Sequence, residues 1–233
     1  MCERFAEQFV VDVAGITDDD RSALWAAMGS ESLVFVQALF VVDVFQRARI
    51  ALERLHATQY GPMLLPPEQG DLWAALEVFM RVVARSEALD PLTTELVRLR
   101  GATVHNCRLC RSRLSVRAYD AAGDRSTFDA VDDYEHSTLS VRQKTALRLT
   151  DAVITQPALI DETLIGQARA EFTTAESSEI ILNVVRNATN KIAVAFSADA
   201  PVVTNGTEFF DTDEAGDVVA DVDADIVRHS TAH

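Results

Sequence analysis

A succession of helix start signals is the feature that most limits how this chain can fold. Three aspartates, Asp18 to Asp20, open the first helical segment, where their charge complements the helix dipole. Later segments have apolar residues at helical spacing or a capping residue in the first turn, over residues 32–52, 72–86, 90–104, 107–123, 140–154, 161–171 and 174–197. We therefore predict an all-α, multi-helix fold.

The helical pattern is interrupted once within the chain, and near the C-terminus a strand pattern takes its place. Three prolines within residues 60–67 remove hydrogen-bond donors and force extended geometry, which predicts an internal boundary there. Farther along, Glu208–Asp211 and Asp217–Ala220 flank a turn-forming segment, which predicts a short β-hairpin. We expect three parts: an N-terminal helical extension over 1–60 that packs on the core, a helical core with a Cys-x-x-Cys site over 61–200, and an acidic tail with the β-hairpin over 201–233.

Composition and charge argue against several classes of function. The formal net charge of −15 at pH 7 would repel phosphate backbones and anionic lipids, so we expect no nucleic-acid or membrane partner. The most apolar run, residues 33–45, is shorter than the roughly 20 apolar residues that a membrane span needs. Three cysteines, two of them clustered, are too few for a secreted disulfide framework, and the N-terminus lacks the pattern of a signal peptide. We expect a cytoplasmic protein.

The pair Cys107 and Cys110 is the strongest candidate for chemistry. At this spacing on a helix both sulfurs lie on one face, close enough to form a disulfide or half of a metal site. If a helix begins near Asn106, its free N–H groups favour the thiolate. Six arginines add positive charge around the pair: Arg98, Arg100, Arg108, Arg111, Arg113 and Arg117. Such a pair can cycle between dithiol and disulfide, and Glu95 can move the proton if burial raises its pKa.

Other interpretations of the same residues remain open. A zinc site would need two more ligands, and the five histidines form no spaced pair with a second cysteine, so we expect no metal and no other cofactor. Both cysteines can instead be small core residues, since free cysteine is often buried. The arginines can equally form a solvated face or a layer of salt bridges between subunits.

Several segments resemble the carboxymuconolactone decarboxylase and alkylhydroperoxidase D-like superfamily. They are Glu-Leu-Val-Arg-Leu-Arg at 95–100, Asn-Cys-Arg-Leu-Cys at 106–110 and the helix-opening run at 140–147, and they follow the family's order. Asn187 and Asn190 lie in a segment that looks like the family's last long helix. The likeness covers about residues 70–200. It implies an alkylhydroperoxidase D-like helical core, assembled into homo-oligomers, with the active site close to subunit contacts.

The resemblance also implies a role for each candidate residue. Carried over from the peroxidase branch, Cys110 attacks a hydroperoxide, Cys107 resolves the product to a disulfide, and Glu95 relays the proton. The implied partners are a small-molecule hydroperoxide or disulfide substrate and a reductant that is either a protein or a small thiol.

The chain departs from the peroxidase pattern at two positions. Leu109 and Leu114 stand where that pattern has histidines, and neither side chain can carry a proton. His105 is a possible substitute relay. The departure favours slow peroxidase or general thiol–disulfide activity over efficient turnover. The alternatives are a catalytically retired, oligomeric binding or structural member of the family, and an enzyme of the lactone decarboxylase branch, against which the cysteine pair argues.

Overall fold

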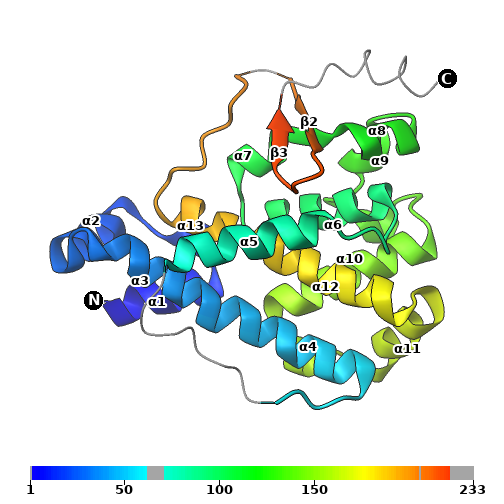
Figure 1. Ribbon diagram of the computed structural model, residues 1–233, viewed down its shortest axis with the longest axis horizontal. Coiled ribbons are helices and arrows are strands. Elements are labelled where there is room, and N and C mark those ends of the chain that lie inside the picture. Colours follow the sequence, from blue (N-terminus) through cyan, green and yellow to red (C-terminus); the bar gives the residue numbers. More distant parts are fainter. Residues whose placement is uncertain (1, 62–70, 205, 221–233) are drawn as a thin grey trace.

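The computed structural model describes residues 2–61, 71–204 and 206–220 of the chain. Within them the fold is mostly helical, with one small sheet formed close to the C-terminus (Figure 1). The structure confirms that the fold is mostly helical and that a β-hairpin forms near the C-terminus. The boundary predicted within 60–67 falls largely outside the described residues.

The helices and strands have the following bounds. The longer helices are α1 (Cys2–Val11), α2 (Asp18–Met28), α3 (Glu31–Phe40), α4 (Gln46–His56), α5 (Leu72–Ala84), α6 (Pro91–Val104), α10 (Val141–Thr155), α11 (Glu162–Glu171) and α12 (Thr174–Ala188). The shorter helices are α7 (Arg108–Arg111), α8 (Val116–Ala122), α9 (Ser126–Asp129) and α13 (Asn190–Ala195), and the strands are β1 (Arg113–Ser115), β2 (Glu208–Thr212) and β3 (Val218–Ala220).

The helix starts lie where the capping residues place them. Thr17, Ser140 and Thr173 each form a reciprocal capping box with the residue three positions later. Asp90 caps α6 by accepting the Thr93 N–H at 2.8 Å, and Pro91 occupies the first helical position. Each cap contributes about 1 kcal/mol to helix stability, so these local signals are strong enough to fix the starts.

Two predicted helices are broken in the structure. The segment 107–123 is interrupted by β1, which pairs in parallel with β2, and the segment 174–197 is interrupted at Thr189. The Thr189 hydroxyl donates to the Arg186 carbonyl at 2.7 Å, and bonds of this kind bend helices. The first break was not predictable from helical periodicity because the partner of β1 lies far away in the sequence.

The helical body is built around α6, which packs on both α10 and α12. A single hydrophobic cluster runs through it and includes Phe5 and Phe9 of α1, so the N-terminal helices share the core of the later ones. Lys191 of α13 forms a 3.2 Å ion pair with Asp43, which lies in the π-helical turn between α3 and α4. The Arg21 Nε of α2 donates to the Ala195 carbonyl at 2.8 Å. These contacts connect the N-terminal helices to α13, the last helix of the body.

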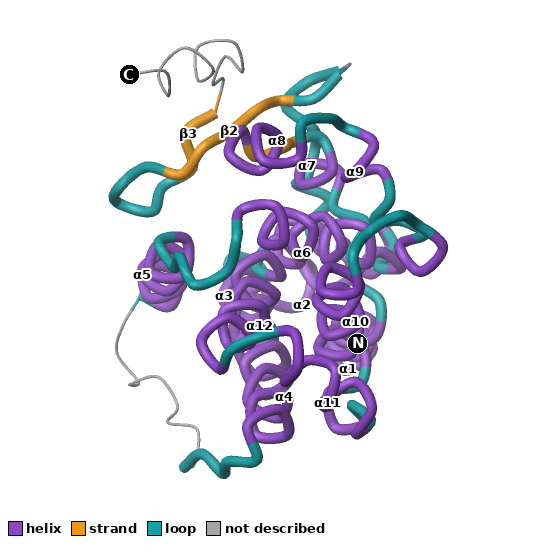
Figure 2. The backbone as a smooth tube through the Cα atoms, turned by 90° about the vertical axis from the view of Figure 1, so that its right-hand side faces the viewer, coloured by secondary structure: helices purple, strands orange, loops and turns teal. Residues whose placement is uncertain are grey.

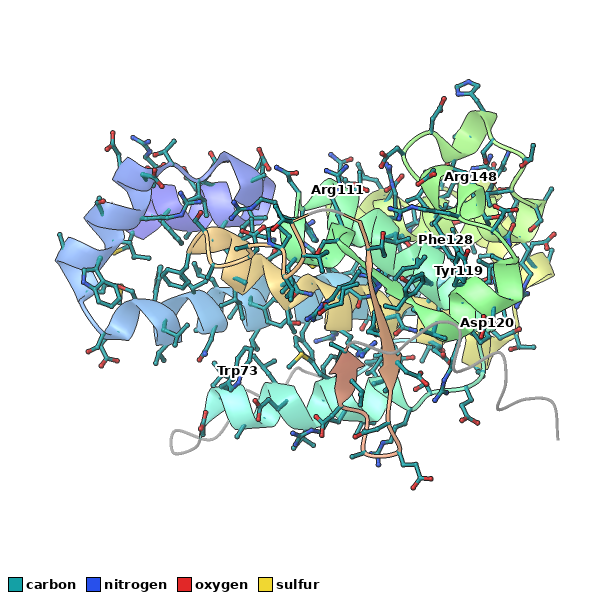
Figure 3. The ribbon with its side chains drawn as sticks, turned by 90° about the horizontal axis from the view of Figure 1, so that it is seen from above. Trp73, Arg111, Tyr119, Asp120, Phe128 and Arg148 are labelled. Carbon is teal, nitrogen blue, oxygen red and sulfur yellow. A yellow bond between two sulfur atoms is a disulfide. The ribbon has the colours of Figure 1, made fainter. Side chains whose placement is uncertain are left out.

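The strands and the short helices α7, α8 and α9 lie together at one end of the helical body (Figures 1 and 2). A second, smaller hydrophobic cluster under them contains Tyr119 and Phe128, both labelled in Figure 3. The turn between β2 and β3 rests on α5, where Gly216 has φ +90° and a Cβ added to it would meet the Arg81 carbonyl oxygen. Only glycine fits this approach.

Among the residues that the structure describes, no single helix is both long and apolar enough to cross a membrane. The pair Asp18–Met28 and Glu31–His56 reaches the required length and hydropathy only jointly, across a bend of 115°.

Candidate functional site

The cysteine pair lies at a sharp turn between α6 and α7. Helix α6 ends at Val104 with His105 as its C-cap, and Asn106 adopts a left-handed conformation with φ 50°, which asparagine tolerates better than most residues. The Cys107 N–H then donates back to the Ala102 carbonyl at 2.9 Å. This turn directs the chain into α7, with Cys107 as its N-cap and Cys110 inside it.

Cys107 and Cys110 are joined by a disulfide, with their Cα atoms 5.3 Å apart. The Cys110 N–H also donates to the Cys107 sulfur at 3.2 Å, so one free N–H of the helix start faces that sulfur, as the sequence predicted. Both residues are buried, but unequally: Cys107 is 1% exposed and Cys110 is 7% exposed. The remaining cysteine, Cys2, is free and partly buried in α1.

Glu95 is connected to the disulfide through Arg98. The Glu95 carboxylate accepts from the Arg98 Nε at 2.7 Å, from the Arg98 Nη2 at 2.6 Å and from the Ser115 N–H at 3.0 Å. The Arg98 Nη1 in turn donates to the Cys110 carbonyl at 2.8 Å. The structure thus brings Glu95 into the same network as Cys110, with the guanidinium as the connecting group. Two of these three donors belong to a guanidinium, so the contacts are charge-assisted and fix the orientation of the Glu95 side chain.

The arginines around the pair are matched by acidic residues from distant parts of the chain. The four closest ion pairs of this kind are Arg100–Asp151, Arg108–Asp199, Arg113–Glu208 and Arg117–Asp211. Of the six arginines singled out in the sequence, Arg111 has no carboxylate partner among the described residues, and it is exposed (Figure 3). The local positive field expected from the sequence is therefore largely cancelled.

A cavity of about 280 Å³ opens beside Cys110, between α5, α12 and the β-hairpin. Cys110 is the cysteine that lines it, whereas Cys107 does not. Met80, Leu109 and Phe210 contribute apolar walls. The polar lining includes Arg98, Arg186, Asn187 and Asn190, together with Glu77, Arg81, Arg113, Thr189 and Asp217. A molecule in this cavity would reach the disulfide at the Cys110 sulfur.

The two leucines that replace the histidines of the peroxidase pattern occupy different surroundings. Leu109 lines the cavity beside Cys110, and Leu114 is buried in β1, within the smaller hydrophobic cluster. Neither position supplies a proton carrier.

His105 lies against both cysteines but is poorly suited to carry a proton. It lines a small void of about 10 Å³ together with Cys107 and Cys110, and its Nε2 has no hydrogen-bond partner among the described residues. Burial, reinforced by the positive charges of Lys191 and Arg47, lowers the pKa of His105 to about 3. The imidazole is therefore neutral at neutral pH, and it is a weak base.

Asp199 fixes the start of α7 from the segment that follows α13. Its carboxylate accepts the Arg108 N–H at 2.8 Å and the Arg108 Nη2 at 2.6 Å, and its carbonyl accepts the Leu109 N–H at 2.9 Å. Burial by itself would raise the pKa of Asp199, but the hydrogen bonds from Arg108 outweigh it and the pKa is lowered.

Replacing Asp199 by asparagine is expected to reduce the acid sensitivity of the fold. A carboxyl whose pKa is lowered on folding contributes stability above its unfolded pKa, here near 3.8, and loses that contribution as the pH falls through the folded value. Asp199→Asn should cost about 1 kcal/mol at pH 7 and much less in strong acid. Thermal unfolding of both proteins at neutral and acidic pH measures this. A deficit that is the same at both pH values would contradict it.

Within the described ranges, no three histidine, cysteine, aspartate or glutamate side chains are grouped so that they could hold a metal ion.

The site also contains residues that the sequence reasoning missed, chiefly Arg186, Asp199 and Phe210. One signal was present for Arg186. Asn183, Arg186 and Asn187 are polar residues at helical spacing among the apolar residues of the second half of α12, which is unusual for a buried segment.

Two relatives resemble the chain over most of its length. They are described as uncharacterized proteins MT2376 and Rv2313c, from Mycobacterium tuberculosis strains CDC 1551 / Oshkosh and ATCC 25618 / H37Rv. Each is 42% identical over 211 residues, which span 88% of this chain and 74% of the relative. No family model and no solved structure matches the chain. The extent and identity of this match show that the chain belongs to the family of the uncharacterized mycobacterial protein Rv2313c.

Proposed function

We propose that this protein is a thiol-dependent redox protein, a peroxidase or disulfide-exchange protein, that cycles Cys107 and Cys110 between dithiol and disulfide. The observation that carries the proposal is the bonded pair itself, with the Cys110 side open to a cavity and the Cys107 side closed. A disulfide with a purely structural role in so short a loop would stabilise little, because its ends are only three positions apart in the sequence.

The proposed reaction with a hydroperoxide proceeds in two balanced steps. The Cys110 thiolate attacks the outer peroxide oxygen, the O–O bond breaks, and the products are a sulfenic acid on Cys110 and an alcohol once the leaving oxygen takes a proton. The Cys107 thiol then attacks the Cys110 sulfur, forming the S–S bond and releasing water. The substrate gains two electrons and the pair loses two. An external thiol reduces the disulfide and completes the cycle.

Arg98 and Glu95 act together in this proposal. Arg98 holds the Cys110 carbonyl and places a positive charge beside the sulfur, which favours the thiolate, while Glu95 holds Arg98 in position. Proton transfer by Glu95 itself requires Arg98 to move aside, because the guanidinium occupies both carboxylate oxygens. We therefore propose Glu95 first as a positioning residue and second as the proton relay that the sequence resemblance implies.

Membership of the carboxymuconolactone decarboxylase and alkylhydroperoxidase D-like superfamily is part of the same proposal. It is supported by the mostly helical fold and by the order of Glu95, the cysteine pair and the Ser140 helix start along the chain. A homo-oligomer with the cavity near a subunit contact is the assembly that this membership implies, and a cytoplasmic location fits a pair that must be reduced again.

Reversible oxidation of the pair tests the proposal directly. In a Cys2→Ser background, the protein reduced with dithiothreitol and then freed of it is expected to consume one equivalent of hydroperoxide. Its mass should fall by two hydrogen atoms, with the change in the peptide that spans Cys107 and Cys110. A second treatment with dithiothreitol should restore the original mass. Thiols that stay reduced under excess oxidant would support the catalytically retired alternative instead.

A further inference from the structure

Arg186 stands apart from the other arginines of the structure. Within the described residues, every other arginine that is at least partly buried donates to a carboxylate or to a backbone carbonyl. Arg186 is partly buried, and its guanidinium makes no hydrogen bond or ion pair with any described residue. The acidic group whose charge acts on it, Glu95, already holds Arg98 with both oxygens.

Two asparagines on the same helix share this lack of partners. The Nδ2 groups of Asn183 and Asn187 are buried and have no hydrogen-bond acceptor in the described part of the chain. Positions 183, 186 and 187 are three and four residues apart, so all three side chains lie on one face of α12. Unpaired buried donors are costly, at about 1–3 kcal/mol each, so two of them beside an unpaired guanidinium on one face are exceptional.

This donor face lies at the cavity beside Cys110. Arg186 and Asn187 line that cavity, and all three donors line a second one of about 300 Å³, which shares Arg186, Asn187 and Phe210 with the first. A ligand that accepts hydrogen bonds from α12 would therefore lie next to the reactive sulfur, with Met80 and Phe210 against its apolar part.

The charge of the site favours a monoanion. Glu95 is ion-paired with Arg98, so Arg186 has no carboxylate partner of its own. Carboxylates also line the two cavities, but Asp217 is paired with Arg81, Glu77 accepts from the Trp73 Nε1, and Glu179 accepts the N–H groups of Ala88 and Leu89. Burial, and then repulsion by Arg98, lower the pKa of the Arg186 guanidinium, so an anion bound beside it would be stabilised by its charge. A carboxylate supplies one negative charge and two planar acceptors that match a guanidinium fork.

We infer that the donor face of Asn183, Arg186 and Asn187 binds a carboxylate on the substrate, so the preferred oxidants are small hydroperoxides or disulfides that carry a carboxylate group. This inference rests on the proposed thiol chemistry and names the class of substrate for it. Arg186 is the main binding residue, and the two asparagines complete the contacts of the carboxylate oxygens.

The test compares two aromatic disulfides that differ in charge. Dithiobis(nitrobenzoate) carries two carboxylates, and dithiodipyridine carries none. Either reagent oxidises the reduced pair to the Cys107–Cys110 disulfide and releases two aromatic thiols, which are followed by absorbance. All proteins carry Cys2→Ser, so that only the pair reacts. In Arg186→Gln, the rate constant for the carboxylated reagent is expected to fall about 10- to 100-fold, with little change for the neutral one.

Two further variants separate binding from other effects. Arg85→Gln removes the same charge from an exposed arginine at the end of α5 and is expected to leave both rates unchanged. Arg186→Lys keeps the charge without the fork and should show a smaller selective loss, which also tests the inference if Arg186→Gln does not fold. Arg186→Gln should fold with a Tm at least equal to that of the parent, because it removes a buried unpaired charge.

The outcomes distinguish this inference from the function on which it rests. If the neutral reagent reacts no faster with the parent protein than with a free thiol, the proposed thiol function fails. If the neutral reagent reacts rapidly but Arg186→Gln lowers neither rate, the carboxylate site is wrong and the redox function stands. Equal losses in Arg186→Gln and Arg85→Gln would show a general effect of net charge, which also overturns the site.

Discussion

Replacing Cys110 by serine is expected to abolish oxidation of the site by hydroperoxides and by aromatic disulfides, with a loss of at least about 100-fold. The reason is access. Cys110 lines the cavity and Cys107 is closed off from it, so an oxidant of more than a few atoms meets the Cys110 sulfur first. A serine hydroxyl is not ionised at neutral pH and cannot replace the attacking thiolate. Stopped-flow measurement of thiol release in a Cys2→Ser background gives the rate.

The matched variant Cys107→Ser should behave differently. It retains the attacking sulfur, so the first step is expected to proceed and then stop, leaving a sulfenic acid or a mixed disulfide on Cys110 that mass spectrometry identifies. The hydrogen bond from the Cys110 N–H to the Cys107 sulfur favours the opposite assignment, because it stabilises a thiolate on Cys107. A trapped adduct in Cys110→Ser, with none in Cys107→Ser, would mean that anion stabilisation outweighs access and that the two roles are exchanged.

Glu95→Gln is expected to lower both stability and reactivity. The Glu95 and Arg98 side chains are only 3% and 12% exposed, and removing one charge of a buried pair costs about 3–5 kcal/mol because the other is left uncompensated. Arg186 lies close enough to add its repulsion. For a chain of this size the Tm should fall by roughly 6–20 °C. Oxidation of the pair should also slow, since Arg98 is no longer held against the Cys110 carbonyl.

A control and a double variant make the Glu95 result specific. Glu135→Gln breaks an ion pair with Arg148 whose side chains are 44% and 33% exposed, and it should cost at most about 1 kcal/mol. Glu95→Gln combined with Arg98→Met removes both buried charges and should recover much of the lost stability without recovering reactivity. A Tm for Glu95→Gln equal to that of Glu135→Gln would refute the structural role of the pair. Recovery of reactivity in the double variant would refute the positioning role.

Much of the fold was predictable because helix starts are local. The capping contacts of Thr17, Asp90 and Ser140 reach only three residues along the chain, and the antiparallel pairing of β2 with β3 spans a short turn. The break of the helix after Cys110 was not predictable, because β1 pairs with a strand 95 residues downstream at Arg113 and Glu208.

The candidate site was also predictable only in part. The sequence placed Cys107 and Cys110 together, and it placed Glu95 one helix earlier, but it could not show that Arg98 connects the two. It also predicted a positive surrounding for the pair, which the tertiary structure corrects through distant carboxylates such as Asp199. Interactions between residues tens of positions apart leave no periodic trace in a single sequence.

The sequence by itself determined the helical class, the helix starts, the hairpin and the pair of thiols three residues apart, because each depends on contacts within a few residues. Only the tertiary structure decided which sulfur meets the cavity, which arginines are neutralised and which one is left without a partner. Those properties depend on how α12, the segment after α13 and the hairpin pack around α6 and α7, and packing joins residues by distance in space rather than along the chain.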